Sequence, residues 1–228
     1  MDVYCKDDIN KKSQWLSVTP TESSLCMPFY MTEIGHFYTN QNYKVKRNYH
    51  DSYLMFYTIS GEGIVIEDNT KICLSAGNMV IIDCHKPHEY FSHSQIWEFM
   101  WMHFSGNNVH KLLKLLYPEN IFPIEIKYRY EIQKNIQEIL ISANNTSLIN
   151  ASDISQRIHS IYSILLKDSL KNEVSDHHTN PDQYVGQFME YVKMNYTKSI
   201  CINDMLCGIP VSKYYFIRIF KRIYLYFI

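Results

Sequence analysis

A basic, aromatic segment near the C-terminus has the residue types and spacing of a helix that reads DNA. One face of such a helix would carry residues at the i, i+3, i+4 and i+7 positions, namely Tyr214, Ile217, Arg218 and Lys221. The major groove of B-DNA admits an α-helix, and a guanidinium matches the acceptors of guanine. We therefore expect Arg218 to contact a base. Phosphate contacts, which add affinity without sequence information, are expected from Lys198, Lys221 and Arg222.

The residues before this segment have the outline of a helix-turn-helix. A short helix would end at Gly208, residues 209–211 would form the turn, and Ser212 is positioned to cap the next helix. We include Ser212 and Lys213 among the predicted DNA-contacting residues. A three-helix packing module with a basic exterior would show the same charge and period.

A second group that could do chemistry consists of four histidines: His85, His88, His93 and His103. Imidazole binds several transition metals. However, His85 and His88 flank a predicted turn at Pro87, and their spacing does not establish three converging ligands. We therefore expect histidines of a turn or a pocket rim, with no metal, no cofactor and no catalytic residue.

Three aromatic residues, Tyr90, Phe99 and Trp101, would face the same way if their strands keep a period of two. An aromatic barrel interior is a cavity that can enclose a small molecule with a few polar anchors. Ordinary core packing would explain the same three residues.

The elements that must position these side chains change type at Ser105–Gly106. Short strands punctuated by turn signals run from Cys26 to Phe104, including 53–59, 64–66, 71–74, 79–82 and 97–104. Apolar residues then recur at helical spacing around 109–116, 132–140 and 154–165. The first dozen residues are expected to be frayed.

These patterns predict an α+β chain in two domains. Residues 1–172 form an antiparallel β-barrel followed by a helical pair, and the polar residues 173–182 form a linker. Residues 183–228 form a small all-α unit with helices at 183–196 and near 202–207 and 212–222.

Charge and composition narrow the class of protein. From Tyr191 onward six basic residues oppose one acid, a net charge of +5, and subtracting this from the chain's −1 leaves −6 for residues 1–190. A basic tail on an acidic body often accompanies polyanion binding. The polar N-terminus, the lack of a long apolar run and six cysteines without a C-x-x-C motif predict a cytoplasmic protein that does not enter the membrane.

Residues 191–222, YVKMNYTKSICINDMLCGIPVSKYYFIRIFKR, resemble the first helix-turn-helix of the AraC-type transcriptional regulators. Residues 53–63, YLMFYTISGEG, and 97–106, WEFMWMHFSG, are similar to the strands that enter and close the cupin barrel of that family. Residues 77–88, GNMVIIDCHKPH, resemble the second cupin motif.

The resemblance implies a ligand-responsive regulator that binds promoter DNA through the major groove. It places Tyr90 and Trp101 where sugar-binding members have pocket aromatics, and Lys46 and Arg47 near a basic pocket residue. The effector would be a small molecule, with a carbohydrate as one candidate. The helices around 128–143 and 153–170 correspond to those that pair two subunits of a homodimer, although packing on their own barrel explains their apolar stripes equally well.

The chain departs from the family pattern at its end. Only the first of two helix-turn-helices is present, and the apolar residues after Arg222 replace a polar turn, so the DNA-binding unit is expected to be truncated. One alternative is therefore a dimerising sensor fragment that does not bind DNA. Another is a metal-dependent cupin enzyme.

Overall fold

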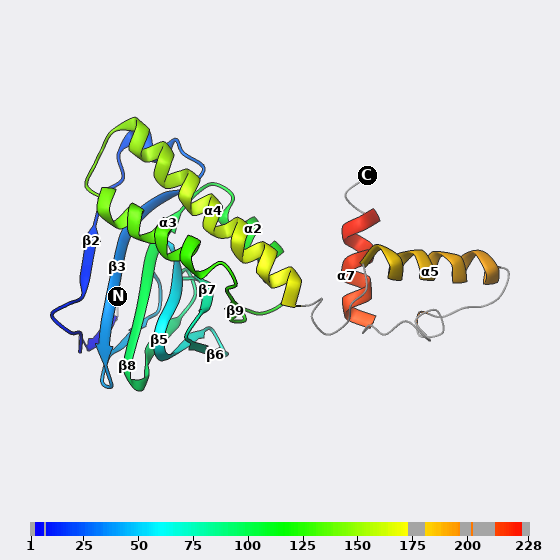
Figure 1. Cartoon of the computed structure of the whole chain (residues 1–228), viewed down its shortest axis with the longest axis horizontal. Helices are drawn as coiled ribbons and strands as arrows, with labels where there is room; N and C mark the ends of the chain where they lie inside the picture. The colour runs from blue at the N-terminus through cyan, green and yellow to red at the C-terminus, as the bar shows by residue number, and fades with distance from the viewer. Residues whose placement is uncertain (1–2, 7, 173–180, 197–201, 203–212, 225–228) are drawn as a thin grey trace. The chain divides into compact units, whose positions relative to one another are not determined.

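The computed structural model describes residues 3–6, 8–172, 181–196, 202 and 213–224. The chain divides into two compact units, Met1–Leu170 and Lys171–Ile228, each described here by itself. The first unit contains an antiparallel nine-stranded sheet followed by helices, which confirms the predicted α+β class (Figure 1).

The sheet contains β1 (Val3–Lys6), β2 (Gln14–Ser17), β3 (Tyr30–Asn40), β4 (Lys44–Arg47), β5 (Tyr53–Glu67), β6 (Thr70–Ser75), β7 (Asn78–Asp83), β8 (His88–Ser105) and β9 (Ile124–Glu125). The helices of the first unit are α1 (Glu22–Leu25), α2 (Val109–Leu116), α3 (Arg129–Ser142) and α4 (Leu148–Asn172).

Two long strands, β5 and β8, organise the sheet because they pair with each other along most of their lengths. The first half of β5 also pairs with β7 and its second half with β6. Likewise, the start of β8 pairs with β4 and its end with β3. Each long strand therefore belongs to two surfaces of a barrel-like sheet.

The bend of β5 occurs where its register with β8 shifts, between Thr58 and Ser60 and again between Gly61 and Gly63. Such bulges bend a strand and increase its twist. Gly61 has a φ of 72°, which favours glycine. The prediction of separate strands at 53–59 and 64–66 is therefore wrong, because the chain continues through the bulges as the single strand β5.

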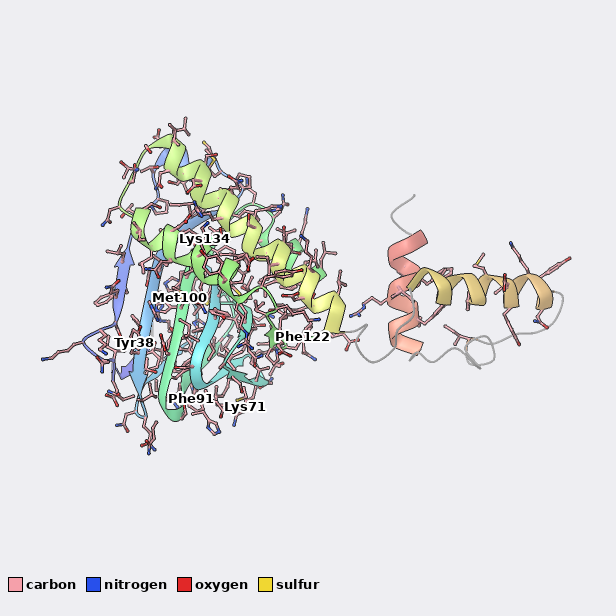
Figure 2. The ribbon with its side chains drawn as sticks, viewed as in Figure 1. Tyr38, Lys71, Phe91, Met100, Phe122 and Lys134 are labelled. Atoms are coloured by element: carbon pink, nitrogen blue, oxygen red, sulfur yellow. The ribbon has the colours of Figure 1, made fainter. Side chains whose placement is uncertain are left out.

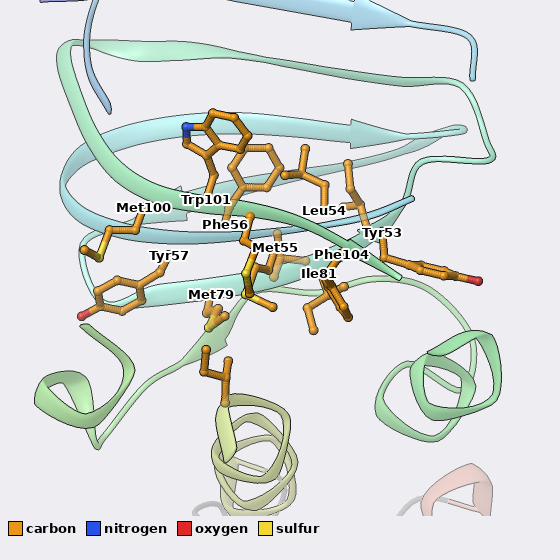
Figure 3. Packing of buried hydrophobic residues seen from close by; sticks show 14 of the residues in the cluster. Tyr53, Leu54, Met55, Phe56, Tyr57, Met79, Ile81, Met100, Trp101 and Phe104 are labelled. Carbon is orange, nitrogen blue, oxygen red and sulfur yellow. The ribbon is translucent and has the colours of Figure 1, made fainter. Parts of the chain in front are cut away.

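The first half of β5 is buried on both faces. Leu54 and Phe56 lie on the same side as Trp101, whereas Met55 and Tyr57 lie on the side of the helices (Figure 3). The stripes of α3 and α4 that cover this side are buried in the same core: Ile132, Ile136, Ile139, Ile154, Ile158, Ile161 and Leu165. These stripes thus pack on their own barrel.

The first dozen residues were expected to be frayed, but Val3–Lys6 form a strand of the sheet, and Gln14–Ser17 just beyond them form another. β1 pairs with β4, and β2 pairs with β3. Elsewhere the outer strands alternate: Lys71 of β6 points into solvent, while its neighbour Ile72 is buried (Figure 2).

The second unit contains α5 (Pro181–Asn195) and α7 (Lys213–Tyr224). Its core consists of Val185, Phe216 and Ile219, with Phe188 and Phe220 packed against them. The predicted inward face of the 212–222 helix is therefore buried. Residues 173–180 of the expected linker, and 203–207 of the expected short helix, lie outside the described residues. Within the described chain, no helix is long and apolar enough to cross a membrane.

The close approach of β5 to the Trp97 ring gives a test of the barrel. A Cβ at Gly63 would collide with this fully buried indole, so Gly63→Ala should lower the free energy of unfolding by about 1–3 kcal/mol. Thermal unfolding followed by tryptophan fluorescence reports on the first unit, which holds Trp15, Trp97 and Trp101. Gly186→Ala, with open space around its Cβ, should leave that transition unchanged. Equal melting of Gly63→Ala and the wild type would contradict the described packing.

Candidate functional site

A cavity of about 210 Å³ lies among β2, β3, β4, β5 and β8. Four of the predicted ligand-binding residues belong to its wall: Arg47, Tyr90, Phe99 and Trp101. The volume is close to that of a single-ring organic molecule rather than a long chain or a macromolecule.

Aromatic rings build most of the wall and hold one another in place. Phe37 packs edge-on against Trp101 with ring centroids 5.1 Å apart, and it also contacts Phe99 at 5.9 Å. Phe99 in turn stacks on Trp97 at 3.9 Å. Phe99 therefore contributes both to the core and to the cavity, so core packing and ligand contact are compatible for this residue.

The inner face also carries polar atoms that lack partners. Arg47 and His88 are directly opposite each other on β4 and β8. Within the described part of the chain, Arg47 Nε, His88 Nε2 and Trp101 Nε1 are buried and form no hydrogen bond. Buried polar groups are usually satisfied, and leaving one unpaired costs about 1–3 kcal/mol. Arg47 and Trp101 line the cavity, and His88 is the strand partner of Arg47, so the three atoms indicate a site that is completed by something else.

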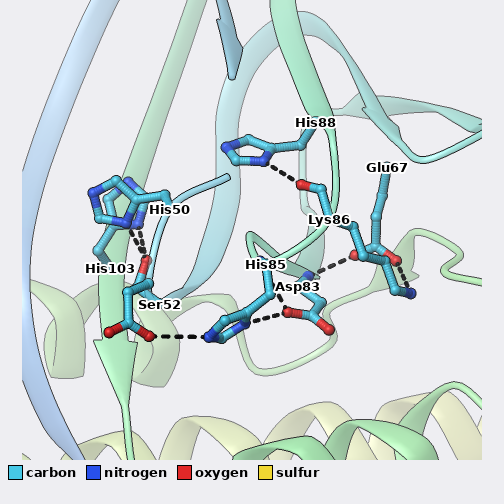
Figure 4. A network of polar contacts seen from close by, with 9 residues as sticks. His50, Ser52, Glu67, Asp83, His85, Lys86, His88 and His103 are labelled. Carbon is cyan, nitrogen blue, oxygen red and sulfur yellow. Dashed lines mark hydrogen bonds and ion pairs between the residues drawn. The ribbon is translucent and has the colours of Figure 1, made fainter. Parts of the chain in front are cut away.

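The protonation of His88 determines what that site can accept. His88 Nδ1 lies 2.8 Å from the Lys86 carbonyl oxygen, to which it must donate (Figure 4). Burial lowers the pKa of His88, and the nearby Arg47 guanidinium lowers it further, so the ring is neutral near pH 7. In a neutral ring that donates from Nδ1, Nε2 is an acceptor. Arg47 Nε and His88 Nε2 are therefore a donor–acceptor pair in the sense of one donor and one acceptor on paired residues, each without a hydrogen-bond partner among the described residues.

A second polar group forms the floor of the cavity. His103 Nδ1 and His50 Nδ1 each lie 2.8 Å from the Ser52 hydroxyl (Figure 4). His50 Nε2 is 3.7 Å from a carboxylate oxygen of Glu33, and Glu33 and His103 both line the cavity. Burial holds the pKa of His103 well below its usual value, aided by His50 and Arg47. The hydrogen bond from His50 lowers the pKa of Glu33 and keeps it ionised.

Lys46 does not line the cavity. In β4, Val45 and Arg47 face inward, so the alternation of the strand directs Lys44 and Lys46 outward. Their ammonium groups contact Glu89 on β8, at 2.6 and 3.4 Å. The two neighbouring cations that the sequence placed together are thus on opposite faces.

The four candidate histidines are separated in the same way. His88 and His103 face the barrel interior, His85 lies on the outer side beside Asp83, and His93 is exposed. No cluster of three or more His, Cys, Asp or Glu side chains in the described ranges has an arrangement that could hold a metal ion.

Sequence reasoning missed several wall residues, including Trp15, Glu33, Phe37 and Phe56. Trp15 was missed because strands were expected only from Cys26 onward, although it lies on β2 with 57% of its surface exposed at the cavity. Phe56 alternates inward with Leu54, a period that the uniformly apolar run 53–59 conceals.

The predicted DNA-contacting residues on α7 are described only in part. In α7, Ile217 and Arg218 are half-buried and Lys221 is exposed. Lys213, Tyr214 and Arg222 belong to α7, but their side chains lie outside the described residues, as do Lys198 and Ser212 altogether.

Two buried neutral histidines predict sensitivity to acid. The pKa values of His88 and His103 are lowered from 6.5, so below pH 6.5 the unfolded chain binds protons that the folded chain does not, and stability falls. His103→Asn, which keeps a hydrogen-bonding group toward Ser52, should reduce this slope by about 1 kcal/mol per pH unit between pH 6.5 and 5. Urea unfolding at several pH values measures it, with exposed His93→Asn as the control. An unchanged slope in His103→Asn would show that the buried ring does not carry the effect.

Comparison with known proteins agrees with this architecture. Residues 31–175 match the family described as AraC-like ligand binding domain. The chain is 19% identical to the Msm operon regulatory protein of Streptococcus mutans serotype c, over 97% of this chain and 75% of that protein.

Among solved structures, the YhaK protein of Escherichia coli is similar with 11% identity and a TM-score of 0.40, over 51% of this chain and 52% of that one. A cupin superfamily protein of Desulfitobacterium hafniense is similar with 14% identity and a TM-score of 0.31, over 41% and 77%. The family match spans more than half of the sequence, and the protein therefore belongs to the AraC-type regulators with an AraC-like ligand-binding domain.

Proposed function

We propose that this ligand-responsive transcription regulator binds specific DNA sequences and that its effector is a neutral, hydroxyl-bearing small molecule, with a carbohydrate as the best fit. The observation that carries the effector class is the donor–acceptor pair of Arg47 Nε and His88 Nε2, both buried and without partners among the described residues.

A hydroxyl group satisfies this pair because it accepts from Arg47 and donates to His88. A carboxylate would satisfy the guanidinium but would face the lone pair of His88 Nε2, and the lowered pKa of that ring opposes its protonation. Trp101 Nε1 is a further donor for a ligand oxygen. The surrounding rings, such as Phe37 and Tyr90, offer apolar faces on which the C–H face of a sugar can stack.

The DNA-binding part of the proposal is supported by α7. Its buried face packs on α5 through Phe216 and Ile219, while Lys221 on another side of the helix is exposed, with the half-buried Ile217 and Arg218 beside it. The excess of positive charge after Tyr191 favours a polyanion.

A homodimer would connect effector binding in the cavity with DNA binding by the second unit. The helices of the barrel unit expose large apolar side chains, among them Tyr130, Ile141 and Ile149, the last with 83% of its surface accessible. Large exposed apolar groups are typical of protein interfaces. Ligand in the cavity would change the spacing of two DNA-binding units only if it binds the two dimer arrangements with different affinity.

The effector class can be tested by thermal shift with neutral pentoses and hexoses and the matching uronic acids. At least one neutral sugar should raise the melting temperature in a concentration-dependent way. His88→Leu should abolish the shift, and Lys46→Met, outside the cavity, should retain it. Stabilisation by uronic acids with no response to any neutral sugar would overturn the proposal.

The DNA claim can be tested by electrophoretic mobility shift on the DNA upstream of this gene and on a scrambled fragment. Arg218→Ala should lose about tenfold or more of the preference for the specific fragment, as expected for a base contact. Lys221→Ala should weaken binding to both fragments about equally. Wild-type protein that shows no sequence preference, with or without a stabilising sugar, would refute sequence-specific binding by this chain.

A further inference from the structure

A charged clamp lies on the outer side of the barrel, behind the floor of the cavity. His85 Nδ1 lies 2.6 Å from an Asp83 carboxylate oxygen, and His85 Nε2 lies 3.1 Å from one of Asp51 (Figure 4). The Asp83 oxygen also accepts the backbone N–H of His85 at 3.1 Å. The clamp therefore ties the turn between β7 and β8 to the loop that precedes β5.

Both ring nitrogens of His85 face carboxylates, which only a protonated imidazole can satisfy, because a neutral ring would direct one lone pair at an anion. Burial alone would lower the pKa of His85, but the hydrogen bonds with Asp83 and Asp51 outweigh it, and the net pKa is raised above 6.5. Tyr49 and Tyr53 are the other titratable groups in contact with the ring among the described residues. Burial raises the pKa of Tyr53 to about 12, with a contribution from the Asp83 and Asp51 carboxylates, so this phenol is neutral while His85 titrates.

The clamp is attached to the cavity floor through the backbone. His50 N donates to the Cys84 carbonyl at 2.8 Å, and Cys84 N donates to the Ser52 carbonyl at 3.2 Å. Side chains alternate across this pairing, so Asp51 points outward to His85 while His50 and Ser52 point inward to His103. Three consecutive residues thus join the outer ion cluster to the inner hydrogen-bond chain.

We propose that protonated His85 holds the 50–52 loop, and with it the Glu33 and His103 floor of the cavity, in the ligand-binding position. Ligand affinity then falls as His85 loses its proton. The effect on affinity rests on the proposed ligand site, whereas the clamp itself does not.

The pH range in which the clamp holds follows from the raised pKa of His85. A group whose pKa is raised in the folded state contributes fully below 6.5, and the contribution is lost as the pH rises through the raised value. This is opposite to the acid sensitivity of His88 and His103, so the two effects separate on a pH axis. Because the Asp51 side chain is 85% exposed, the effect is limited to about fivefold, the upper range for exposed ion pairs.

Backbone amide hydrogen exchange of segment 48–54 in the full chain tests the clamp without any ligand. Each variant is compared with wild type at the same pH, at 6.0, 7.5 and 9.0, which cancels the intrinsic pH dependence of exchange. His85→Gln should exchange about fivefold faster than wild type at pH 6.0 and equally at pH 9.0. His85→Arg keeps a permanent charge and should stay protected throughout. Asp51→Asn, at an exposed position that folding tolerates, should resemble His85→Gln, and exposed His93→Gln should match wild type.

Equal exchange of His85→Gln, Asp51→Asn and wild type at pH 6.0 would overturn the clamp. The link to the cavity is measured separately, by the affinity of wild type and His85→Arg for the neutral sugar that stabilises the protein most. Affinity that declines above pH 7 in wild type but not in His85→Arg supports the link, and parallel profiles overturn it. A failure of every sugar to bind would refute the proposed effector while leaving the exchange result intact.

Discussion

Burial of β5 and β8 on both faces is the constraint on which the rest of the structure depends. One side of these strands must be covered by α3 and α4, and the other side must close around an interior. Aromatic residues such as Phe56, Phe99 and Trp101 fill that interior incompletely and leave the cavity. The bulges beside Gly61 allow one strand to serve both surfaces, so the same backbone that builds the core also forms the ligand site.

The alternation of side chains along these strands also places charged residues of different roles on the inner and outer faces of the barrel. Inward residues such as Arg47, His88 and His103 lie in a poorly solvated space, where an unpaired atom is costly and therefore informative. Outward neighbours, such as Lys46 with Glu89, form solvated pairs of little energetic consequence. The His50–Ser52 segment connects the two faces, because consecutive residues there point alternately to the outer clamp and to the cavity floor.

The period-two and helical patterns of the sequence were sufficient to predict the α+β class, the apolar stripes of the helices and the inward face of α7. They were sufficient for Phe99 and Trp101, which are two residues apart, whereas Tyr90 lies nine residues before Phe99 on the same strand and reaches the cavity only because the register of β8 against β5 shifts between them. They failed where burial on both faces removes the alternation, as in residues 53–59, and where strand pairing is non-local, as with Trp15 on β2. The partnerless nitrogens of Arg47 and His88 could not be predicted, because they depend on register across β4 and β8.

The central claim is that a neutral ligand hydroxyl bridges Arg47 and neutral His88. Calorimetric titration of the His85→Arg variant, in which the clamp position does not titrate, with the most stabilising neutral sugar at pH 7 in two buffers of different ionisation enthalpy counts the protons exchanged on binding at the Arg47–His88 site. A hydroxyl that donates to His88 Nε2 leaves every protonation state unchanged, so the two observed enthalpies should agree. A difference between buffers that corresponds to uptake of about one proton would mean that His88 binds as a cation, and would contradict the account.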